Sequence, residues 1–248
     1  MARKSAHLQN AGRLRGKVAL VTGASRGIGL AIAQKLAEEG CELAISARNL
    51  KALQKAGREL ARQKAPVLGH ACDVSNPEAV ALLLEAVEEQ FGRIDILVNN
   101  AGISHVMAPV EQLEIETWQK VIATNLTGMF LVTRAALPLM KAGATIVNNL
   151  SVAAKGVFAG EAAYCASKHG ALGLTNTLRE ELRPKGIRVI ALMPGPTATD
   201  IWDQFWPGAP RKKMMSPATV AAAIVSALVL PANSTIDELV INPTAGAL

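Results

Sequence analysis

Short apolar runs alternate with longer amphipathic segments along almost the whole chain. The apolar runs predict strands at 17–22, 42–47, 66–72, 94–98, 144–149, 187–193 and 237–241. The segments between them have helical periodicity and predict helices at 28–39, 49–63, 76–90, 114–140, 161–182 and 217–229. Strands that are apolar on both faces and alternate with helices are typical of a parallel sheet with helices on each side. Because crossovers between parallel strands are right-handed, we expect a doubly wound, Rossmann-type α/β fold.

No linker or internal repeat interrupts this alternation, so we expect one domain over 15–248 of the 248 residues. Two segments stand apart from it. The first is residues 1–14, which we expect to be a flexible basic leader. The second is the irregular stretch 194–216, which opens with Pro194-Gly195-Pro196 just beyond the carboxyl end of a strand. Open α/β sheets bind ligands at that end, so 194–216 is a candidate mobile lid over the substrate.

Composition narrows the classes of function. Half of the residues (50%) are hydrophobic, and no apolar run reaches the ~20 residues of a membrane-spanning helix, so we expect a soluble, cytoplasmic protein without a membrane partner. The net charge of +6 is concentrated near the amino end, at Arg3, Lys4, Arg13, Arg15 and Lys17. A basic leader without aromatic residues forms no groove, so we expect no nucleic-acid partner. A transit peptide is the alternative to a solvated tail. Three cysteines without paired spacing indicate a reducing compartment and no metal site.

A glycine-rich segment, Thr22-Gly23-Ala24-Ser25-Arg26-Gly27-Ile28-Gly29, joins the first strand to the first helix. Gly23 allows a sharp exit from the strand, Gly27 lets the main chain approach a pyrophosphate, and Gly29 lets helix and sheet pack closely. The amino end of the helix then offers free N–H groups to the phosphates. This order of strand, glycine loop and helix predicts a dinucleotide site.

Several motifs follow the glycine loop in a characteristic order. They are Asn99-Asn100-Ala101-Gly102, Asn125, Ser151, Tyr164-x3-Lys168 and Pro194-Gly195. With these motifs the chain, from about Arg15 to Val240, resembles the classical branch of the short-chain dehydrogenase/reductase family. The pattern is closest to NADPH-dependent carbonyl and 3-oxoacyl reductases. The resemblance implies a seven-stranded sheet in the order 3-2-1-4-5-6-7, and a homotetramer or homodimer formed through the long central helices and the last strand.

Four residues are the candidate catalytic groups. Tyr164 and Lys168 lie four residues apart in a predicted helix, so both side chains emerge on one face. A phenol has a reference pKa of about 10, and a nearby ammonium favours its ionised form, so the pair suits proton transfer. The resemblance implies that Tyr164 exchanges a proton with the substrate, that Lys168 also holds the nicotinamide ribose, and that Ser151 hydrogen-bonds the substrate oxygen. It assigns to Asn125 a main-chain distortion that holds a water linking Lys168 to solvent; a buried amide satisfied by the backbone is the alternative.

The second strand ends without the acid that binds the ribose hydroxyls in many NAD-dependent folds. Arg48 stands there instead, and Arg26 lies in the glycine loop; both suit the 2′-phosphate of NADP(H). A surface arginine at a helix start is the alternative for Arg48, and a capping residue is the alternative for Asp73. Together with the positions that the family resemblance implies, the expected cofactor contacts are Gly23, Ser25, Arg26, Gly27, Ile28, Gly29, Arg48, Asp73, Val74, Asn99, Ala101, Gly102, Tyr164, Lys168, Pro194, Gly195, Thr197 and Thr199.

The candidate lid holds Trp202, Phe205 and Trp206, although the chain has only three Trp, one Tyr and four Phe. Such a cluster fits an apolar substrate, burial against a neighbouring subunit, or docking of the segment onto its own domain. His105, after the Asn-Asn-Ala-Gly motif, is a further candidate substrate contact. We therefore expect an NADP(H)-dependent oxidoreductase that acts on an apolar ketone, aldehyde or 3-oxoacyl group. The alternatives are a non-catalytic NADP-binding sensor or scaffold of the same fold, and a sugar-nucleotide epimerase or dehydratase.

Overall fold

Each predicted apolar run forms a strand in the computed structural model, which describes residues 12–63, 65–231 and 233–246. The seven strands pair in parallel in one sheet of order β3-β2-β1-β4-β5-β6-β7. They are β1 (Val18–Thr22), β2 (Glu42–Ala47), β3 (Val67–Ala71), β4 (Ile96–Asn99), β5 (Thr145–Asn149), β6 (Arg188–Pro194) and β7 (Glu238–Ile241). The expected fold class and strand order are confirmed.

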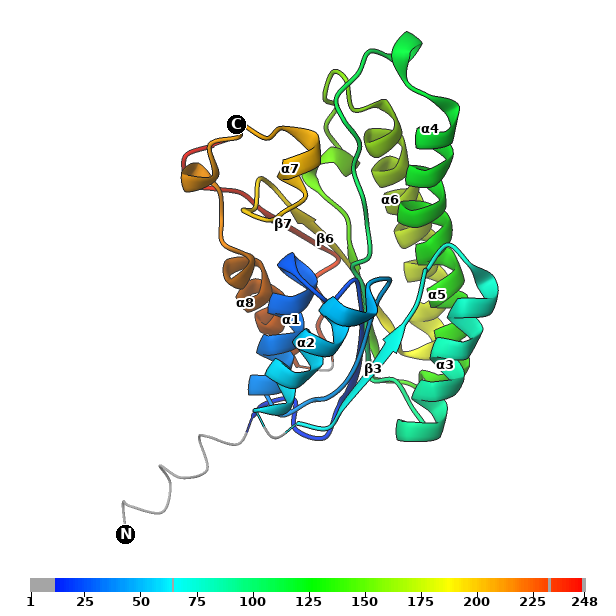
Figure 1. The fold of residues 1–248 in the computed structure, drawn as a ribbon. Coiled ribbons are helices and arrows are strands. Elements are labelled where there is room, and N and C mark those ends of the chain that lie inside the picture. The colour runs from blue at the N-terminus through cyan, green and yellow to red at the C-terminus, as the bar shows by residue number, and fades with distance from the viewer. Residues whose placement is uncertain (1–11, 64, 232, 247–248) are drawn as a thin grey trace.

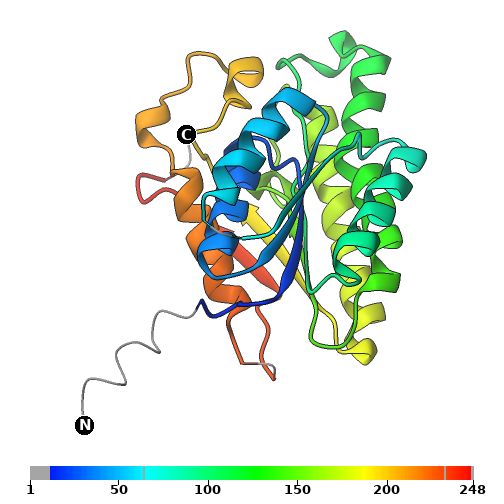
Figure 2. The same cartoon turned by 60° about the horizontal axis from the view of Figure 1, so that its bottom comes forward.

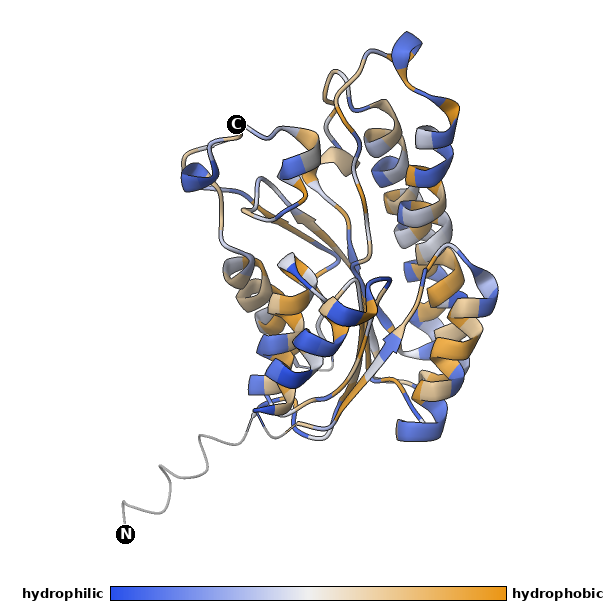
Figure 3. Cartoon of the chain, viewed as in Figure 1, coloured by the Kyte–Doolittle hydropathy of each residue, from blue (hydrophilic) through white to orange (hydrophobic). Residues whose placement is uncertain are grey.

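Helices cover both faces of the sheet (Figures 1 and 2). One face carries α1 (Gly27–Glu38), α2 (Leu50–Ala61) and α8 (Pro217–Leu228); the other carries α3 (Pro77–Phe91), α4 (Ile115–Ile122), α5 (Gly128–Ala136) and α6 (Ala162–Leu182). Apolar residues of the helices pack on the sheet and form a large core cluster on each face. Figure 3 shows hydrophobic residues, in orange, on the strands and on the helices that flank them. Burial on both faces explains why the inner strands β1, β4 and β6 are mostly apolar, whereas the outer strands β3 and β7 are partly exposed.

The central helix differs from its expected form. Instead of one helix over 114–140, α4 passes into a π-helical turn at Ala123–Thr127, and α5 then ends in a 3₁₀ turn at Leu137–Leu139. By length and composition alone, the stretch Ile115–Leu139 meets the criterion for a membrane-spanning helix. In this fold it is a core helix, because Val132 and Ala136 pack in the interior against the sheet.

Part of the expected flexible leader belongs to the packed body. Residues 1–11 lie outside the described residues. Leu14, however, is buried in the core, and its N–H donates to the carbonyl of Glu39 at 3.1 Å. Arg13 also donates to the Glu39 carboxylate through Nη2 (2.8 Å) and Nε (3.2 Å). The boundary expected at Arg15 is therefore too late, because an apolar anchor and an ion pair precede it.

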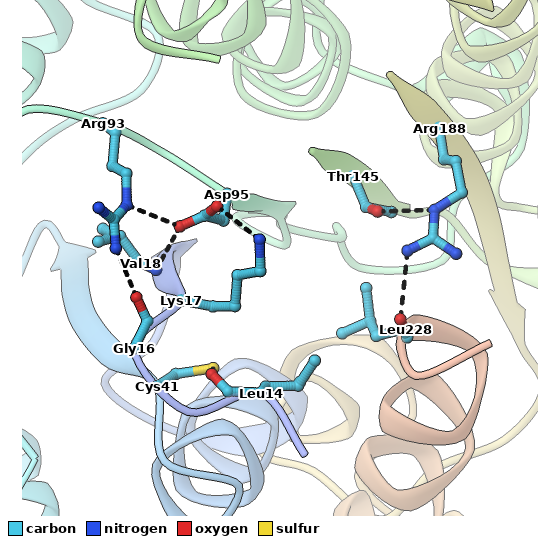
Figure 4. Close-up of polar contacts among 10 residues, drawn as sticks. All are labelled: Leu14, Gly16, Lys17, Val18, Cys41, Arg93, Asp95, Thr145, Arg188 and Leu228. Atoms are coloured by element: carbon cyan, nitrogen blue, oxygen red, sulfur yellow. Dashed lines mark hydrogen bonds and ion pairs between the residues drawn. The ribbon is translucent and has the colours of Figure 1, made fainter. Parts of the chain in front are cut away.

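Polar contacts fix the amino ends of the central strands, at the edge of the sheet that carries no predicted site residue (Figure 4). Asp95, just before β4, accepts hydrogen bonds from Lys17 Nζ (2.9 Å), Val18 N (2.9 Å) and Arg93 Nε (3.1 Å). Arg188, at the start of β6, donates to Thr145 Oγ1 at 3.1 Å. These contacts hold the strands together at their amino ends, and the predicted site residues lie at the opposite, carboxyl ends.

Candidate active site

The glycine loop between β1 and α1 has the conformation that its sequence predicts. Gly23 and Gly27 adopt φ values of +65° and +59°, in the left-handed region that favours glycine. A Cβ on Gly23 would lie 2.8 Å from Ala101 Cα, and one on Gly29 would lie 2.2 Å from Asn100 Nδ2. The inner side of the loop therefore packs against the segment after β4 with no room for side chains.

The outer side of the loop fits a dinucleotide. A Cβ on Gly27 would approach Thr199 Cγ2 within 3.4 Å, so a side chain there would narrow the gap between the loop and the 194–216 segment. Helix α1 begins at Gly27 and has no acidic residue in its first turn, and Ser25 is half-buried beside it. The free N–H groups of a helix start attract phosphate, so the residues at this gap suit a pyrophosphate.

The two neighbouring asparagines after β4 do different work. Asn99 is buried, and its Nδ2 donates to Thr133 Oγ1 and Asn148 Oδ1, both at 2.9 Å. Its Nδ2 thus ties the central sheet to α5, while its Oδ1 is buried and has no hydrogen-bond partner among the described residues. Asn100 instead donates through Nδ2 to the carbonyls of Thr22 (2.9 Å) and Gly23 (3.2 Å). Asn100 therefore holds the glycine loop, a role that the sequence did not assign to it.

Arg48 is exposed at the carboxyl end of β2 and pairs with no acidic residue in the described part of the chain. Helix α2 begins at Leu50 with Asn49 as its cap, so Arg48 also fits the alternative of a surface arginine at a helix start. Asp73 lies nearby, after β3. Burial raises the pKa of Asp73, but hydrogen bonds from Ser75 and the charges of Arg48 and Lys120 hold it below its usual value. The capping alternative for Asp73 is wrong, because Asn76 caps α3.

Ser151, Tyr164 and Lys168 meet where β5 ends and α6 begins. Lys168 Nζ lies 5.5 Å from the centre of the Tyr164 ring and donates to the carbonyl of Asn149 at 3.0 Å. Burial lowers the pKa of the Lys168 ammonium to about 8. Burial also raises the pKa of Tyr164 to about 12, while the Ser151 side chain, within hydrogen-bonding reach of the phenol, opposes that shift. The three groups thus form one cluster at the carboxyl edge of the sheet.

Asn125 lies at the centre of the π-helical turn, where the resemblance implied a main-chain distortion. Its Oδ1 accepts from Ile103 N and its Nδ2 donates to Ile103 O, both at 2.8 Å. Nδ2 also donates to Ser167 Oγ at 3.0 Å, and that hydroxyl donates to Tyr164 O at 2.7 Å. Asn125 therefore fixes the loop after Gly102 to the helix that carries the tyrosine. These contacts fit the alternative of a buried amide satisfied by the backbone, and the water that the resemblance implies stays a prediction.

The 194–216 segment crosses the carboxyl edge next to the glycine loop. Pro194 and Gly195 are buried, and Thr197 donates to the Gly195 carbonyl at 3.0 Å. The indole N–H of Trp202 donates to Thr197 O at 2.8 Å, at the start of the short helix α7 (Trp202–Phe205). The ring of Trp202 packs against Phe205 and Trp206, with centroids 4.9 and 6.5 Å apart.

This aromatic cluster stands beside the loops that precede α4 and α6, at the same end of the sheet (Figure 1). The two loops are joined by a hydrogen bond from Ala108 N to Gly160 O at 3.0 Å. Val106, Met107, Val157, Phe158 and Trp206 are apolar residues exposed on these segments. His105 is only 5% exposed, and its Nδ1 contacts Val106 O at 2.8 Å. His105 is therefore an interior residue of the loop.

Sequence reasoning missed four residues that shape this site. Asn100 and Asn149 link the glycine loop, β4, β5 and Lys168. Ser167 joins Asn125 to the tyrosine, and Glu161 is buried one turn before the tyrosine. Asn100 and Ser167 stand inside the motifs that were recognised. The partners of Asn149 and Glu161 come from distant segments, so no local pattern marks those two residues.

A Rossmann-type sheet with a glycine loop and a tyrosine–lysine pair at one edge defines the class of protein. It is a nicotinamide-dependent oxidoreductase that acts on alcohol and carbonyl groups. The chain belongs to the short-chain dehydrogenase family, whose model matches residues 17–209. The family resemblance of the motifs is thereby confirmed.

Individual relatives have different substrates and cofactors. A D-threitol dehydrogenase of Mycolicibacterium smegmatis is 38% identical over 224 residues, which cover 86% of each chain. An alcohol dehydrogenase of Thermococcus sibiricus, solved with 5-hydroxy-NADP, has a TM-score of 0.88 and 32% identity and covers 94% of this chain and 99% of that chain. A 3-ketoacyl-(acyl-carrier-protein) reductase of Brucella melitensis, solved with NADH, has a TM-score of 0.84 and 30% identity over 93% of this chain and 98% of that chain.

Proposed function

We propose that the protein is an NADP(H)-dependent carbonyl reductase, reversible as an alcohol dehydrogenase, for an apolar ketone, aldehyde or 3-oxoacyl compound. The observation that carries this proposal is the cluster of Tyr164, Lys168 and Ser151 beside a glycine loop. A non-catalytic sensor needs only the glycine loop to bind the cofactor. Burying an ammonium next to a phenol costs folding free energy, and such a pair is typical of sites that transfer protons.

Each residue of the cluster has a role in this reaction. A bound nicotinamide supplies or accepts the hydride. Ser151 holds the substrate oxygen with its hydroxyl, and Tyr164 Oη donates a proton to that oxygen during reduction. The positive charge of Lys168 stabilises the phenolate left behind, because its ammonium lies 5.5 Å from the ring. Asn125 keeps the neighbouring loop in place through its two bonds to Ile103.

We assign the 2′-phosphate of the cofactor to Arg48 and Arg26. Arg48 is exposed at the end of β2 and pairs with no described acid, and Arg26 lies at the start of α1 on the outer side of the loop. Their guanidinium groups match a phosphate in charge and geometry. The remaining cofactor contacts of the glycine loop, of Asp73-Val74, of Asn99 to Gly102 and of Pro194 to Thr199 are part of the same proposal.

The exposed apolar residues around the site favour an apolar substrate. Val157 and Phe158 precede α6, Met107 precedes α4, and Trp206 belongs to the 194–216 lid; all are more than two-fifths exposed. Such side chains give up solvent contact favourably when an apolar molecule covers them. The segment Glu238-Leu239-Val240 and the residues after it lack the Asp-Gly-Gly motif that is common near the carboxyl end of the family's 3-oxoacyl-carrier reductases. This difference favours a free ketone or aldehyde over a substrate bound to a carrier protein.

The proposal also includes a homotetramer or homodimer and a cytoplasmic location. Ile115 and Trp118 on α4, Phe130 on α5 and Val240 on β7 are exposed apolar residues on the central helices and the last strand. These are the elements through which related members assemble. Cys41, Cys72 and Cys165 are free and buried, as suits a reducing compartment.

The decisive experiment follows NADPH oxidation with a panel of apolar ketones and aldehydes, and D-threitol oxidation with NADP⁺. We expect turnover of the apolar carbonyl compounds, and we expect Tyr164→Phe to abolish it while NADPH still binds, because the variant loses only the hydroxyl. NADPH binding without turnover of any compound would leave the sensor alternative. Full activity of Tyr164→Phe would refute the proton donor.

The cofactor assignment has its own test. Arg48→Asp should weaken NADPH relative to NADH by about 1.5–3 kcal/mol, the size of a charge-assisted hydrogen bond. Arg62→Asp, a change of the same charge at the carboxyl end of α2, is the control and should leave the ratio of the two dissociation constants unaltered. An unchanged preference in Arg48→Asp would exclude Arg48 as the discriminating residue.

A further inference from the structure

Glu161 is a buried carboxyl next to the catalytic cluster that the proposed reaction does not use. It stands directly before α6 and is 1% exposed. Its Oε2 accepts from Ser104 Oγ at 3.3 Å, which is a long hydrogen bond. Its Oε1 has no hydrogen-bond partner among the residues that the structure describes. The ionised form of this carboxyl would therefore be stabilised by only one long hydrogen bond.

The ionisation of Glu161 falls within the working range of an enzyme. Burial raises the pKa of Glu161 to about 7, and the hydrogen bond from Ser104 opposes the shift. The carboxyl is therefore largely neutral below pH 7 and charged above it. Its side chain makes no capping hydrogen bond to α6, so this change of charge leaves the helix start intact.

The charge of Glu161 acts on Tyr164, which follows it by one helical turn. A negative charge near a phenol disfavours the phenolate, so ionised Glu161 adds to the effect of burial on Tyr164. The other titratable groups at this place are Cys165 and Lys168 on α6, and His105 beside Ser104 on the loop after β4. Lys168 is the one cation of the cluster among the described residues, and its ammonium favours the phenolate.

We propose that Glu161 is a positioning residue whose negative charge disfavours the phenolate of Tyr164 and so works against the alcohol-oxidising direction, in which that phenolate accepts a proton. The charged ammonium of Lys168 favours the phenolate form of Tyr164, and the ionised carboxylate of Glu161 disfavours it. The proposal rests on the role of Tyr164 proposed above. It predicts that neutralising Glu161 makes the phenol a stronger acid, which favours the phenolate needed for alcohol oxidation.

The chain offers a direct test, because Tyr164 is its only tyrosine. The long-wavelength absorbance of tyrosinate therefore titrates this residue alone, in the full chain and without substrate. The absorbance is read within milliseconds of a jump to alkaline pH, before the protein unfolds, and Tyr164→Phe supplies the blank. We expect Glu161→Gln to increase the acid dissociation constant of Tyr164 by about twofold to tenfold, the range for a charge within about 10 Å at a partly solvated site.

Three further variants separate charge from structure. Ser104→Ala removes the hydrogen bond but leaves Glu161 ionised at alkaline pH, so the midpoint of Tyr164 should stay at the wild-type value. Glu180→Gln removes an exposed charge near the far end of the same helix and should also have no effect. Glu161→Met provides a second uncharged side chain of similar size if the glutamine variant does not fold, and should lower the midpoint.

Two results would overturn the proposal: an unchanged midpoint in the folded uncharged variants, or an equal shift in Ser104→Ala, which would show a structural effect. Because the titration needs no turnover, it stands even if no carbonyl compound is reduced. Where turnover is found, the rise of kcat/KM for alcohol oxidation should move to lower pH in Glu161→Gln and stay in place in Glu180→Gln.

Discussion

Replacement of Asn125 by alanine is the sharpest test of how the site is held together. The side chain is 1% exposed and makes three hydrogen bonds, two to the main chain of Ile103 and one to Ser167. A buried hydrogen bond contributes about 1 kcal/mol net, which gives about 3 kcal/mol for the three. The N–H and C=O of Ile103 would lose their partners as well.

Two effects limit the size of the loss. Ile103 is only half-buried, so water can reach its freed main-chain groups, and Ser167 keeps its bond to Tyr164 O. We therefore expect Asn125→Ala to lower the free energy of unfolding by about 2–4 kcal/mol. For a domain of this size, that corresponds to a fall in Tm of roughly 6–12 °C.

The assay is urea unfolding followed by tryptophan fluorescence, with Thr127→Ala as the control. Thr127 lies in the same π-helical turn but is exposed, so its truncation should change the free energy by less than about 0.5 kcal/mol. If Asn125→Ala lowered the free energy of unfolding no more than Thr127→Ala, the three hydrogen bonds would not stabilise the turn. The contacts from Asn125 to the loop would then contribute nothing to stability.

Two other predictions concern the two edges of the sheet. Gly29→Ala would place a Cβ 2.2 Å from Asn100 Nδ2 and push Asn100 off the glycine loop, so the Kd for NADPH should rise about tenfold or more, about 1.4 kcal/mol; Gly173→Ala, which meets nothing within 4 Å, should bind NADPH like the wild type. Burial raises the pKa of Asp95, but bonds from Val18, Lys17 and Arg93 hold it below its usual value, so its ionised form stabilises the fold. Asp95→Asn should thus lower the free energy of unfolding by about 1–2 kcal/mol at pH 7. This is a low value for hydrogen bonds to a charged group, because Lys17 and Arg93 are half exposed. The difference from the wild type should vanish as the pH falls through the folded pKa of Asp95. A loss of equal size at low pH in urea titrations would contradict the assignment.

The strands and most helices could be predicted because their information is local. A parallel strand buried on both faces reads as a continuous apolar run, and 42–47 coincides with β2. Helix starts are also local: Asn49, Asn76 and Ser216 each accept a hydrogen bond from a main-chain N–H three residues on. The motifs, taken in order, led to the right family.

What could not be predicted depends on contacts between distant segments. The π-helical turn at 123–127 keeps a helical pattern in the sequence, and Asn125 is pulled toward Ile103, 22 residues away. The burial of Glu161 depends on the loop after β4, which folds over the start of α6. The packing of Leu14 likewise requires Glu39 from the end of α1. Composition near these residues indicates only a loop or a solvated tail.

The contact between Arg26 and Asp200 links the proposed cofactor site to the proposed lid. Arg26 Nη1 lies 3.5 Å from Asp200 Oδ2, and both side chains are more than half exposed. An exposed pair of this kind contributes about 0–1 kcal/mol, whereas a charge-assisted bond to a phosphate contributes about 1.5–3 kcal/mol. A bound 2′-phosphate should therefore replace Asp200 as the ion-pair partner of Arg26. The carboxylate then faces a phosphate of like charge, so binding of NADP(H) should turn Asp200 away from the glycine loop and shift the start of the 194–216 segment with it, whereas NAD(H), which lacks the phosphate, should leave the pair intact.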